Sequence, residues 1–223
     1  MAHAPDRAAD TRRRLLEAAV EVFAEDGYRK ATIQQICRRA RANIAAAHYH
    51  FGDKERLYAA AFEFAERRAR ADAPAEPSSD GDPETRLRHH VSWFLRRLLD
   101  PNRPAWMARL LAHELVEPTR ALDRLVRRRM RANHEQIGAV IRMLLGSAAT
   151  PELVRLSTLS VVSQCVFYRN SAAIISRLYP QIDPAREVEA IADHVTRFSL
   201  AALQGLRDGK TSRNHDGRKA ARA

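Results

Sequence analysis

Glycine and cysteine are both scarce in this chain, which has 8 glycines and 2 cysteines among its 223 residues. A fold of many short strands and tight turns needs more glycine, so we expect an all-α protein. The isolated cysteines, Cys37 and Cys165, form neither a disulfide framework nor the paired spacing of a metal site. They fit a reducing compartment, and we expect a cytoplasmic protein.

Long apolar runs are also missing. No stretch reaches the roughly 18–20 apolar residues that cross a bilayer. Residues 1–20 mix acidic with basic side chains and have no cleavage site after an apolar core. The sequence therefore predicts no membrane partner and no signal peptide.

Catalytic and metal-binding motifs are absent as well. The chain has no nucleophile motif, no glycine-rich phosphate loop and no carboxylate pair, and its histidines lack ligand spacing. His48 and His50, two residues apart on an expected helix, point to different faces and so do not form a metal pair. We expect no enzyme activity, no metal and no cofactor.

Positive charge is what the chain has in excess, with a formal net charge of +11. The excess lies at the two ends, and the middle of the chain is nearly balanced. Basic ends around a neutral middle predict a polyanionic partner. For the tail, 208–223, the alternative is that its charge only aids solubility; this segment lacks periodicity, and we expect it to be disordered.

Capping signals divide the chain into helices. The Pro-, Ser-, Gly- and Asp-rich residues 72–84 are the best candidate for a connection between two domains. Asp10-Thr11, Thr32, Asn43 and Asp53 are the expected N-caps of the first four helices. Helices are predicted over residues 11–26, 32–40, 44–50, 54–71, 84–99, 104–116, 118–145, 151–179 and 184–207.

The short helices 32–40 and 44–50 are joined by only three residues and lie between two longer helices. This is the outline of a helix-turn-helix, whose second helix enters the DNA major groove. We therefore predict a three-helix DNA-binding domain over 9–70, with its helix-turn-helix at 32–51. The alanines of the second helix permit close approach to bases, and the His-Tyr-His that follows can donate to phosphate or base acceptors. Alternatively, one ring of this triplet packs in the core and two are solvated.

Residues Thr11 to Tyr58, TRRRLLEAAVEVFAEDGYRKATIQQICRRARANIAAAHYHFGDKERLY, resemble the N-terminal domain of TetR-family transcriptional repressors. The threonine that opens the first helix, the pattern AA..VFAEDGY and the pattern YHFGDKE.L carry the resemblance. Two later segments, PAWMARLLAHELVEPTRALD and LSVVSQCVFYRNSAAIISRLY, resemble the C-terminal domain of the subgroup named after CecR. Members of that subgroup are associated with drug-efflux and antibiotic-sensitivity genes.

The TetR resemblance implies phosphate contacts from Thr32, Tyr49, His50 and Lys54 and base contacts from Gln34, Ala46, Ile44 and His48. Two further candidates come from the helix-turn-helix outline: the N-cap Asn43, because the start of a recognition helix lies near phosphates and bases, and the turn residue Arg41. Which ring of the triplet reads bases stays open, because His48 stands where the family usually has tyrosine.

The turn departs from the family, because Arg41 stands where glycine is usual. Either the turn differs slightly, or the arginine accepts a left-handed conformation at a cost of roughly 1–2 kcal/mol and reaches a phosphate.

The remaining helices predict a ligand-binding and dimerisation domain over 84–207. Apolar stripes with a few embedded polar groups are typical of a small-molecule pocket, although each polar residue taken alone fits an ordinary core edge. The candidate pocket residues are Trp93, Trp106, His113, Gln164, Phe167, Tyr168 and Arg169. Helices 151–179 and 184–207 are apolar over wide arcs with small residues interspersed, which predicts the homodimer interface.

The sequence thus predicts a ligand-responsive transcriptional regulator, a homodimeric repressor that binds a palindromic operator in double-stranded DNA and is released by a small-molecule effector, such as a drug or toxic compound. Activation of transcription stays open. The alternative is a helical small-molecule-binding protein whose basic ends bind nucleic acid without sequence preference. A helical enzyme is the third and weakest candidate.

Overall fold

The computed structural model describes the backbone of residues 4–71, 76, 80–101 and 104–220, and the side chains of 7–70, 76, 80–101 and 104–209. These residues form helices and contain no strand. The chain divides into two compact units, which are described separately: unit 1 comprises Met1–Ala73 and Asn102–Arg129, and unit 2 comprises Pro74–Pro101 and Met130–Ala223.

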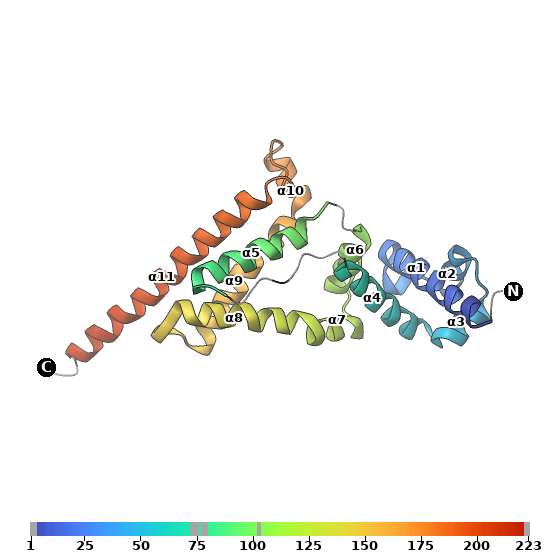
Figure 1. Cartoon of the computed structure of the whole chain (residues 1–223), viewed down its shortest axis with the longest axis horizontal. Helices are drawn as coiled ribbons and strands as arrows, with labels where there is room; N and C mark the ends of the chain where they lie inside the picture. Colours follow the sequence, from blue (N-terminus) through green and yellow to red (C-terminus); the bar gives the residue numbers. More distant parts are fainter. Residues whose placement is uncertain (1–3, 72–75, 77–79, 102–103, 221–223) are drawn as a thin grey trace. The chain divides into compact units, whose positions relative to one another are not determined.

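Unit 1 contains the first four helices and two helices from the middle of the chain (Figure 1). Its helices are α1 (Ala4–Lys30), α2 (Ile33–Ala40), α3 (Ile44–Phe51), α4 (Lys54–Ala71), α6 (Ala105–Val116) and α7 (Arg120–Leu125). α1 packs against α2, α4 and α6, and its buried stripe includes Leu15, Ala19 and Phe23. The core also contains Tyr58 of α4, whose ring meets Phe23 edge-on with centroids 4.8 Å apart.

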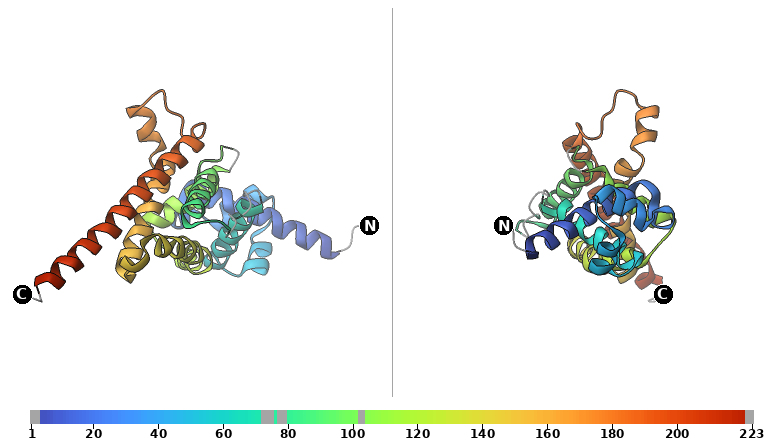
Figure 2. Two further views of the ribbon diagram at one scale, coloured as in Figure 1. Left: turned by 60° about the vertical axis from the view of Figure 1, so that its left-hand side comes forward. Right: turned by 90° about the vertical axis from the view of Figure 1, so that its right-hand side faces the viewer.

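Unit 2 is a bundle with an aliphatic core. Its helices are α5 (Pro83–Leu99), α8 (Arg131–Leu145), α9 (Pro151–Asn170), α10 (Ala172–Leu178) and α11 (Val188–Ala220), with a short 3-10 turn, η2 (Gly146–Ala148). Leu95 of α5 and Ile141 of α8 are fully buried in this core, where they pack with Val161 of α9 and Val195 of α11. Figure 2 shows α11 as a long helix that crosses the other helices of this unit.

The division into units differs from the predicted boundary at 84, because α6 and α7 pack with the N-terminal helices. The physical reason lies in the buried side of α6, where Leu110 and Glu114 are almost inaccessible to solvent. Contacts of α6 with α1 and α4 bury these side chains. Sequence periodicity identifies such an apolar side but does not reveal which helix covers it.

Helix bounds differ from the prediction at the start of α1, which begins at Ala4 rather than at Thr11. Pro5 falls in the first turn, where its missing N–H removes no hydrogen bond. Thr11 is therefore not an N-cap, and its hydroxyl donates to the Arg7 carbonyl at 2.9 Å. The predicted break at Gly27 is present, since this residue has φ 73° inside the assigned helix.

The predicted helix 118–145 is interrupted. Thr119, rather than a residue before Pro118, caps α7 by accepting from the Ala121 N–H at 3.1 Å. A π-helical segment, η1 (Val126–Met130), then separates α7 from α8. No proline or glycine marks the interruption, so it had no local sequence signal. The predicted end at Gly146 is present, with φ 54°.

The helices near the C-terminus also differ from the prediction. The expected helix 151–179 breaks at Ser171 into α9 and α10, at an Asn-Ser pair of low helix propensity. Asp183 caps only a turn, in which its carboxylate accepts from the Ala185 N–H at 3.0 Å, and α11 starts later, at Val188.

The predicted disordered tail is helical through Ala220, past the expected end at Gly209. The sequence after Pro184 contains no proline, and an isolated glycine weakens a helix by about 1 kcal/mol without ending it. Residues 221–223 of that predicted tail lie outside the described residues.

Candidate nucleic-acid interface

α2 begins with the predicted capping box. Gln35 N donates to Thr32 Oγ1 at 3.1 Å, and Thr32 N donates to Gln35 Oε1 at 2.8 Å. This reciprocal pair satisfies two free backbone donors at the start of the helix. Thr32 and Gln34 are both solvent-exposed, while Ile36 and Cys37 are buried on the opposite side. The two predicted DNA-contact residues of α2 therefore face outward.

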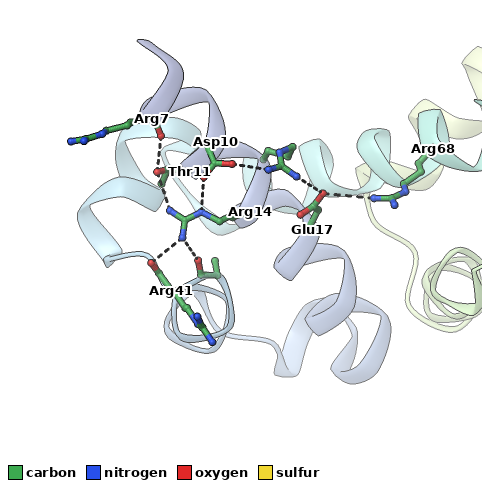
Figure 3. Close-up of polar contacts among 9 residues, drawn as sticks. Arg7, Asp10, Thr11, Arg14, Glu17, Arg41 and Arg68 are labelled. Carbon is green, nitrogen blue, oxygen red and sulfur yellow. Dashed lines mark hydrogen bonds and ion pairs between the residues drawn. The ribbon is translucent and has the colours of Figure 1, made fainter. Parts of the chain in front are cut away.

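The turn after α2 is left-handed at Arg41, with φ 50° and ψ 47°. Arg41 is exposed, and it is the one non-glycine residue with positive φ in the described part of the chain. The Arg14 guanidinium donates to the carbonyls of Ala40, at 3.2 Å, and Arg41, at 3.5 Å (Figure 3). A cation on these free carbonyls stabilises the end of α2 and offsets part of the strain at Arg41.

α3 starts at its predicted cap, where Ala46 N donates to Asn43 Oδ1 at 2.7 Å. Ala47 and Phe51 are buried and fix the helix to the unit. Asn43, Ile44 and His48 are exposed, Ala46 and His50 are half-buried, and Tyr49 is 84% exposed. A tyrosine so exposed contributes little to the core. The His48-Tyr49-His50 triplet therefore lies mainly on the solvent side of the helix.

His48 has a defined orientation, because its Nδ1 lies 2.6 Å from the Gly52 carbonyl. A carbonyl only accepts, so Nδ1 donates this hydrogen bond, and in the neutral imidazole Nε2 is then the acceptor. The ring contacts of the triplet also extend along the helix, since the Tyr49 and His50 rings lie 5.1 Å apart and edge-on.

Lys54 opens α4 and is held inside unit 1. Its Nζ donates to the Arg29 carbonyl at 3.0 Å and lies 4.9 Å from the centre of the Tyr28 ring. Burial lowers the pKa of this ammonium. The preceding residue, Asp53, is the predicted cap and accepts from the Arg56 N–H at 2.8 Å. Lys54 is thus half-buried beside the turn that it follows.

A buried polar cluster that the sequence did not reveal ties α4 to α6 and α7. The Tyr58 hydroxyl donates to Glu114 Oε1 at 2.5 Å, and Thr119 donates to the same carboxylate from its backbone N–H and its hydroxyl, each at 2.8 Å. Glu114 is completely buried. Burial and the hydrogen bond to Glu114 raise the pKa of Tyr58. The only sequence signal was a glutamate in the apolar stretch LLAHELV.

The candidate effector residues fall into both units. Trp106 and His113 belong to unit 1, whereas Trp93, Gln164, Phe167, Tyr168 and Arg169 belong to unit 2. His113 has a packing role: its ring covers Gly27, and its Nε2 lies 3.3 Å from the Ala24 carbonyl.

In unit 2, Trp93 is buried beside His90, with ring centres 5.7 Å apart. Phe167 is 53% exposed, while the side chains of Gln164, Tyr168 and Arg169 are half-buried. Gln164 donates to Ser199 Oγ at 3.4 Å.

A hollow of about 810 Å³ lies between α4 and α7 in unit 1. Eight of its ten lining residues are charged, and none is a candidate effector residue. The lining residues are Asp53, Glu55, Arg56, Ala59, Ala60, Glu63, Arg120, Asp123, Arg124 and Arg127. Such a lining differs from the mostly apolar walls of a typical small-molecule pocket.

Within the described part of the chain, no three His, Cys, Asp or Glu side chains lie together as a metal site. In the same residues, no helix is both long and apolar enough to cross a membrane.

Comparison with known proteins identifies the family. The family model of bacterial regulatory proteins of the tetR family matches residues 15–61. The model of the C-terminal domain of the HTH-type transcriptional dual regulator CecR matches residues 83–203. The chain belongs to the TetR family. TetR-family members are transcriptional regulators rather than enzymes, and they bind operator DNA, usually as homodimers. The predicted family, helical fold and DNA-binding function are confirmed.

Individual TetR-family proteins are similar to this chain in sequence or in fold over more than half of its length. The HTH-type transcriptional repressor NicS of Pseudomonas putida is 29% identical over 210 residues, covering 88% of this chain and 92% of that protein. The HTH-type transcriptional regulator BetI of Agrobacterium fabrum is 30% identical over 124 residues, covering 55% and 60%. A putative transcriptional regulator from Pseudomonas aeruginosa PAO1 has a similar fold, with a TM-score of 0.61 at 19% identity over 88% of this chain and 92% of that one.

Proposed function

We propose that this TetR-family protein is a cytoplasmic repressor that binds a palindromic operator as a homodimer and releases it when a small-molecule effector binds. The observation that carries the proposal is the outward side of α3, where Ile44, His48 and Tyr49 are exposed on a helix anchored by Phe51. A short helix with exposed contact residues and a buried anchor suits insertion into a major groove.

The base-reading role falls to α3, with Gln34 of α2 beside it. Ile44 and Ala46 offer apolar contact to thymine methyl groups, and His48 Nε2 can accept from the amino group of adenine or cytosine. The Gly52 carbonyl fixes the His48 ring in this orientation, which reduces the entropy lost on binding.

Phosphate contacts are assigned to residues around this helix. Tyr49 is 84% exposed, and Thr32, Asn43 and His50 also carry hydrogen-bonding side chains. Arg41 is exposed on a turn held by Arg14. Lys54 adds positive charge, but because its ammonium also binds the Arg29 carbonyl, it contributes to the rigidity of the unit as well.

Dimerisation is assigned to α9, α10 and α11, within the segments 151–179 and 184–207. Five large apolar side chains on α9 and α11 are exposed in the single chain: Leu156 (46%), Leu159 (46%), Phe167 (53%), Phe198 (61%) and Leu206 (44%). A second copy of the chain would cover these side chains if they form one apolar patch, which is a common sign of an interface. A homodimer would present two α3 helices to half-sites about 34 Å apart or a multiple of that spacing.

We assign α6 a part in effector release, because its buried contacts reach α4 and α7 within unit 1. Its buried Glu114 binds Tyr58 of α4 and the cap of α7, so a displacement of α6 changes the position of α4. An effector achieves release only by binding the DNA-incompetent arrangement more tightly, typically by about 1–3 kcal/mol. Our proposal for effector contacts keeps the candidate residues of each unit apart, with drugs or other toxic compounds as the class to test first: Trp93, Gln164, Phe167, Tyr168 and Arg169 in unit 2, and Trp106 and His113 in unit 1.

The test is fluorescence anisotropy at physiological salt with DNA flanking the protein's own gene and with scrambled DNA. We expect a selectivity of at least about 10³-fold, lost in large part in His48→Ala, whereas Tyr49→Ala should weaken binding to both DNAs because a phosphate contact is independent of sequence. Tyr49→Phe keeps the ring and removes only the hydroxyl, so it tests whether the hydroxyl makes that contact. Equal binding of both DNAs by the wild type would contradict the proposal and favour a protein with non-specific basic ends.

The dimer assignment is tested by sedimentation velocity on Phe198→Glu and Leu159→Glu. We expect both to shift the protein towards monomer. Met143→Glu is the control, because Met143 of α8 is similarly exposed, at 44%, but lies outside the proposed interface. An unchanged dimer in both variants would place the interface elsewhere.

A further inference from the structure

The first turns of α1 are fixed against the helix-turn-helix. Arg14 connects them: its guanidinium donates to the Ala40 and Arg41 carbonyls and to Thr11 Oγ1 at 3.3 Å, and it pairs with Asp10 at 3.2 Å (Figure 3). These contacts are formed before any DNA is bound. The segment that precedes Arg14 is therefore held in place beside the turn.

Arg12 lies on the other side of this segment, at the end of α3. Its guanidinium carbon is 5.3 Å from the centre of the Phe51 ring, and Phe51 is the last residue of α3. The side chain is exposed. A guanidinium over a ring keeps its N–H groups free at its edge, so Arg12 can donate to a ligand while it is positioned by Phe51.

The neighbouring arginine is neutralised, whereas Arg12 is not. Arg13 pairs with Asp10 at 2.7 Å and with Glu17 at 3.4 Å. By contrast, among the described side chains no carboxylate lies within ion-pair distance of Arg12. The same holds for Arg7, which is also exposed and lies one turn before Thr11 (Figure 3).

Most other arginines of unit 1 are paired as Arg13 is, including Arg29 with Glu117, Arg39 with Glu25 and Arg68 with Glu17. An exposed pair contributes little to stability but cancels charge. Uncompensated charge at Arg12, over the last residue of α3, and at Arg7, whose carbonyl binds Thr11, therefore raises the positive potential near the predicted DNA contact surface.

We propose that Arg7 and Arg12 form a further DNA-binding element, a basic flank of α1 that contacts phosphates outside the groove occupied by α3. The ligand is the sugar–phosphate backbone, because a guanidinium fork binds phosphate oxygens independently of sequence. This inference rests on the proposed function. It extends the contact surface beyond residues 32–54 and assigns the segment before Leu15 a binding role.

The signature of the flank is a change in salt dependence. Each neutralised phosphate contributes about 0.9 to the slope of log Kobs against log salt concentration. We expect Arg12→Ala to make the slope shallower by about 0.9 and Arg7→Ala to do the same. Affinity falls by the same factor for operator and scrambled DNA, so selectivity is unchanged. Arg13→Ala, with its charge already compensated, is the matched control and leaves the slope unaltered.

The experiment is anisotropy with the full chain from about 50 to 200 mM salt, on both DNAs, for the wild type and the variants Arg7→Ala, Arg12→Ala, Arg12→Lys and Arg13→Ala. Arg12→Lys keeps the charge and is expected to retain most of the slope. Thermal melting of each variant controls for the Phe51 contact.

Two results would overturn the inference. If the salt slopes of Arg7→Ala and Arg12→Ala equal that of Arg13→Ala, Arg7 and Arg12 make no phosphate contact and the inference is rejected. The proposed function would be unaffected, because it rests on operator selectivity and not on the slope. Loss of selectivity in Arg12→Ala at constant slope would show that Arg12 acts only by supporting α3. Failure of the wild type to discriminate between the DNAs is a separate result, and it would reject the proposed function itself.

Discussion

The two units stabilise their interiors differently. In unit 1, a carboxylate is buried among aromatic rings, with Tyr58 donating to Glu114 and packing against Phe23 and Tyr28. In unit 2, the core is aliphatic, with Leu95 and Ile141 at its centre. Directional hydrogen bonds permit few arrangements, whereas aliphatic packing accepts several of similar energy.

This difference fits the two tasks that we propose. Unit 1, which we propose reads DNA, must hold α3 in one orientation. Its buried hydrogen bonds restrict the other arrangements that its helices could adopt. A unit that dimerises and senses an effector needs a core that can shift. The following substitutions would sharpen or break this comparison.

The largest effect is expected in the aliphatic core. Ile141→Ala removes buried methyl and methylene groups from a site with no solvent exposure and should reduce the free energy of unfolding by about 2–5 kcal/mol. Ile141→Val should cost about 0.5–1.5 kcal/mol. Urea denaturation followed by circular dichroism measures both. A loss below 1 kcal/mol for Ile141→Ala would mean that the core collapses to fill the cavity.

In the polar core, Glu114→Gln should cost about 1–3 kcal/mol, because its amide NH₂ meets donors from Tyr58 and Thr119 that the carboxylate accepted. The control is Glu117→Gln, where the side chain is 49% exposed and pairs with Arg29; a change below about 0.5 kcal/mol is expected there. We measure thermal unfolding and operator affinity together. Equal changes in stability and operator affinity in the two variants would argue that the buried cluster does not determine how the helices of unit 1 are arranged.

A pH dependence is expected from unit 2. Burial lowers the pKa of His90 from its ordinary 6.5, an effect that the Asn133 side chain and Glu76 oppose. Below about pH 6.5 the unfolded chain binds a proton that the folded one does not, so stability falls as pH is lowered towards the folded pKa. The slope contributed by His90 reaches at most about 1.4 kcal/mol per pH unit.

His90→Gln should remove this part of the dependence, and His89→Gln, at an exposed position, should leave it in place. Urea titrations between pH 7.5 and 5 compare the three proteins. Identical pH profiles for the wild type and His90→Gln would reject the assignment.

The smallest effect is expected at the turn. Glycine accepts the φ of 50° at position 41 without strain, so Arg41→Gly should change stability by about 1 kcal/mol or less, as relief of strain is offset by a more flexible unfolded chain. DNA affinity should fall all the same, because the exposed guanidinium is lost. Unchanged affinity on both DNAs would exclude Arg41 as a phosphate contact.

Local sequence signals predicted the helix-turn-helix, α2 and α3, well. The capping box at Thr32 and the cap at Asn43 act through residues three positions away, so sequence spacing contains their geometry. The same reasoning failed at Thr11 and at the predicted start of a helix at 184. There the cap motif was present, but the helix started elsewhere. A short-range capping motif competes with the contacts and backbone preferences of the residues around it.

The roles of particular arginines could not be predicted at all. Arg12, Arg13 and Arg14 are adjacent in the sequence, yet one lies over Phe51, one pairs with Asp10 and Glu17, and one binds the carbonyls at the end of α2. Rotation of about 100° per residue points each side chain to a different neighbour. Those neighbours come from segments 26–39 positions away for Arg14 and Arg12.

By itself, the sequence determined the helical class, the helix-turn-helix and the family, because caps, apolar periodicity and motif spacing are properties of contiguous residues. Only the tertiary structure decided that α6 and α7 join the reading unit, that Glu114 is buried against Tyr58, and which arginines keep their charge uncompensated. These outcomes depend on distances between residues far apart in the chain, and burial and pairing energies act through those distances rather than through position in the sequence.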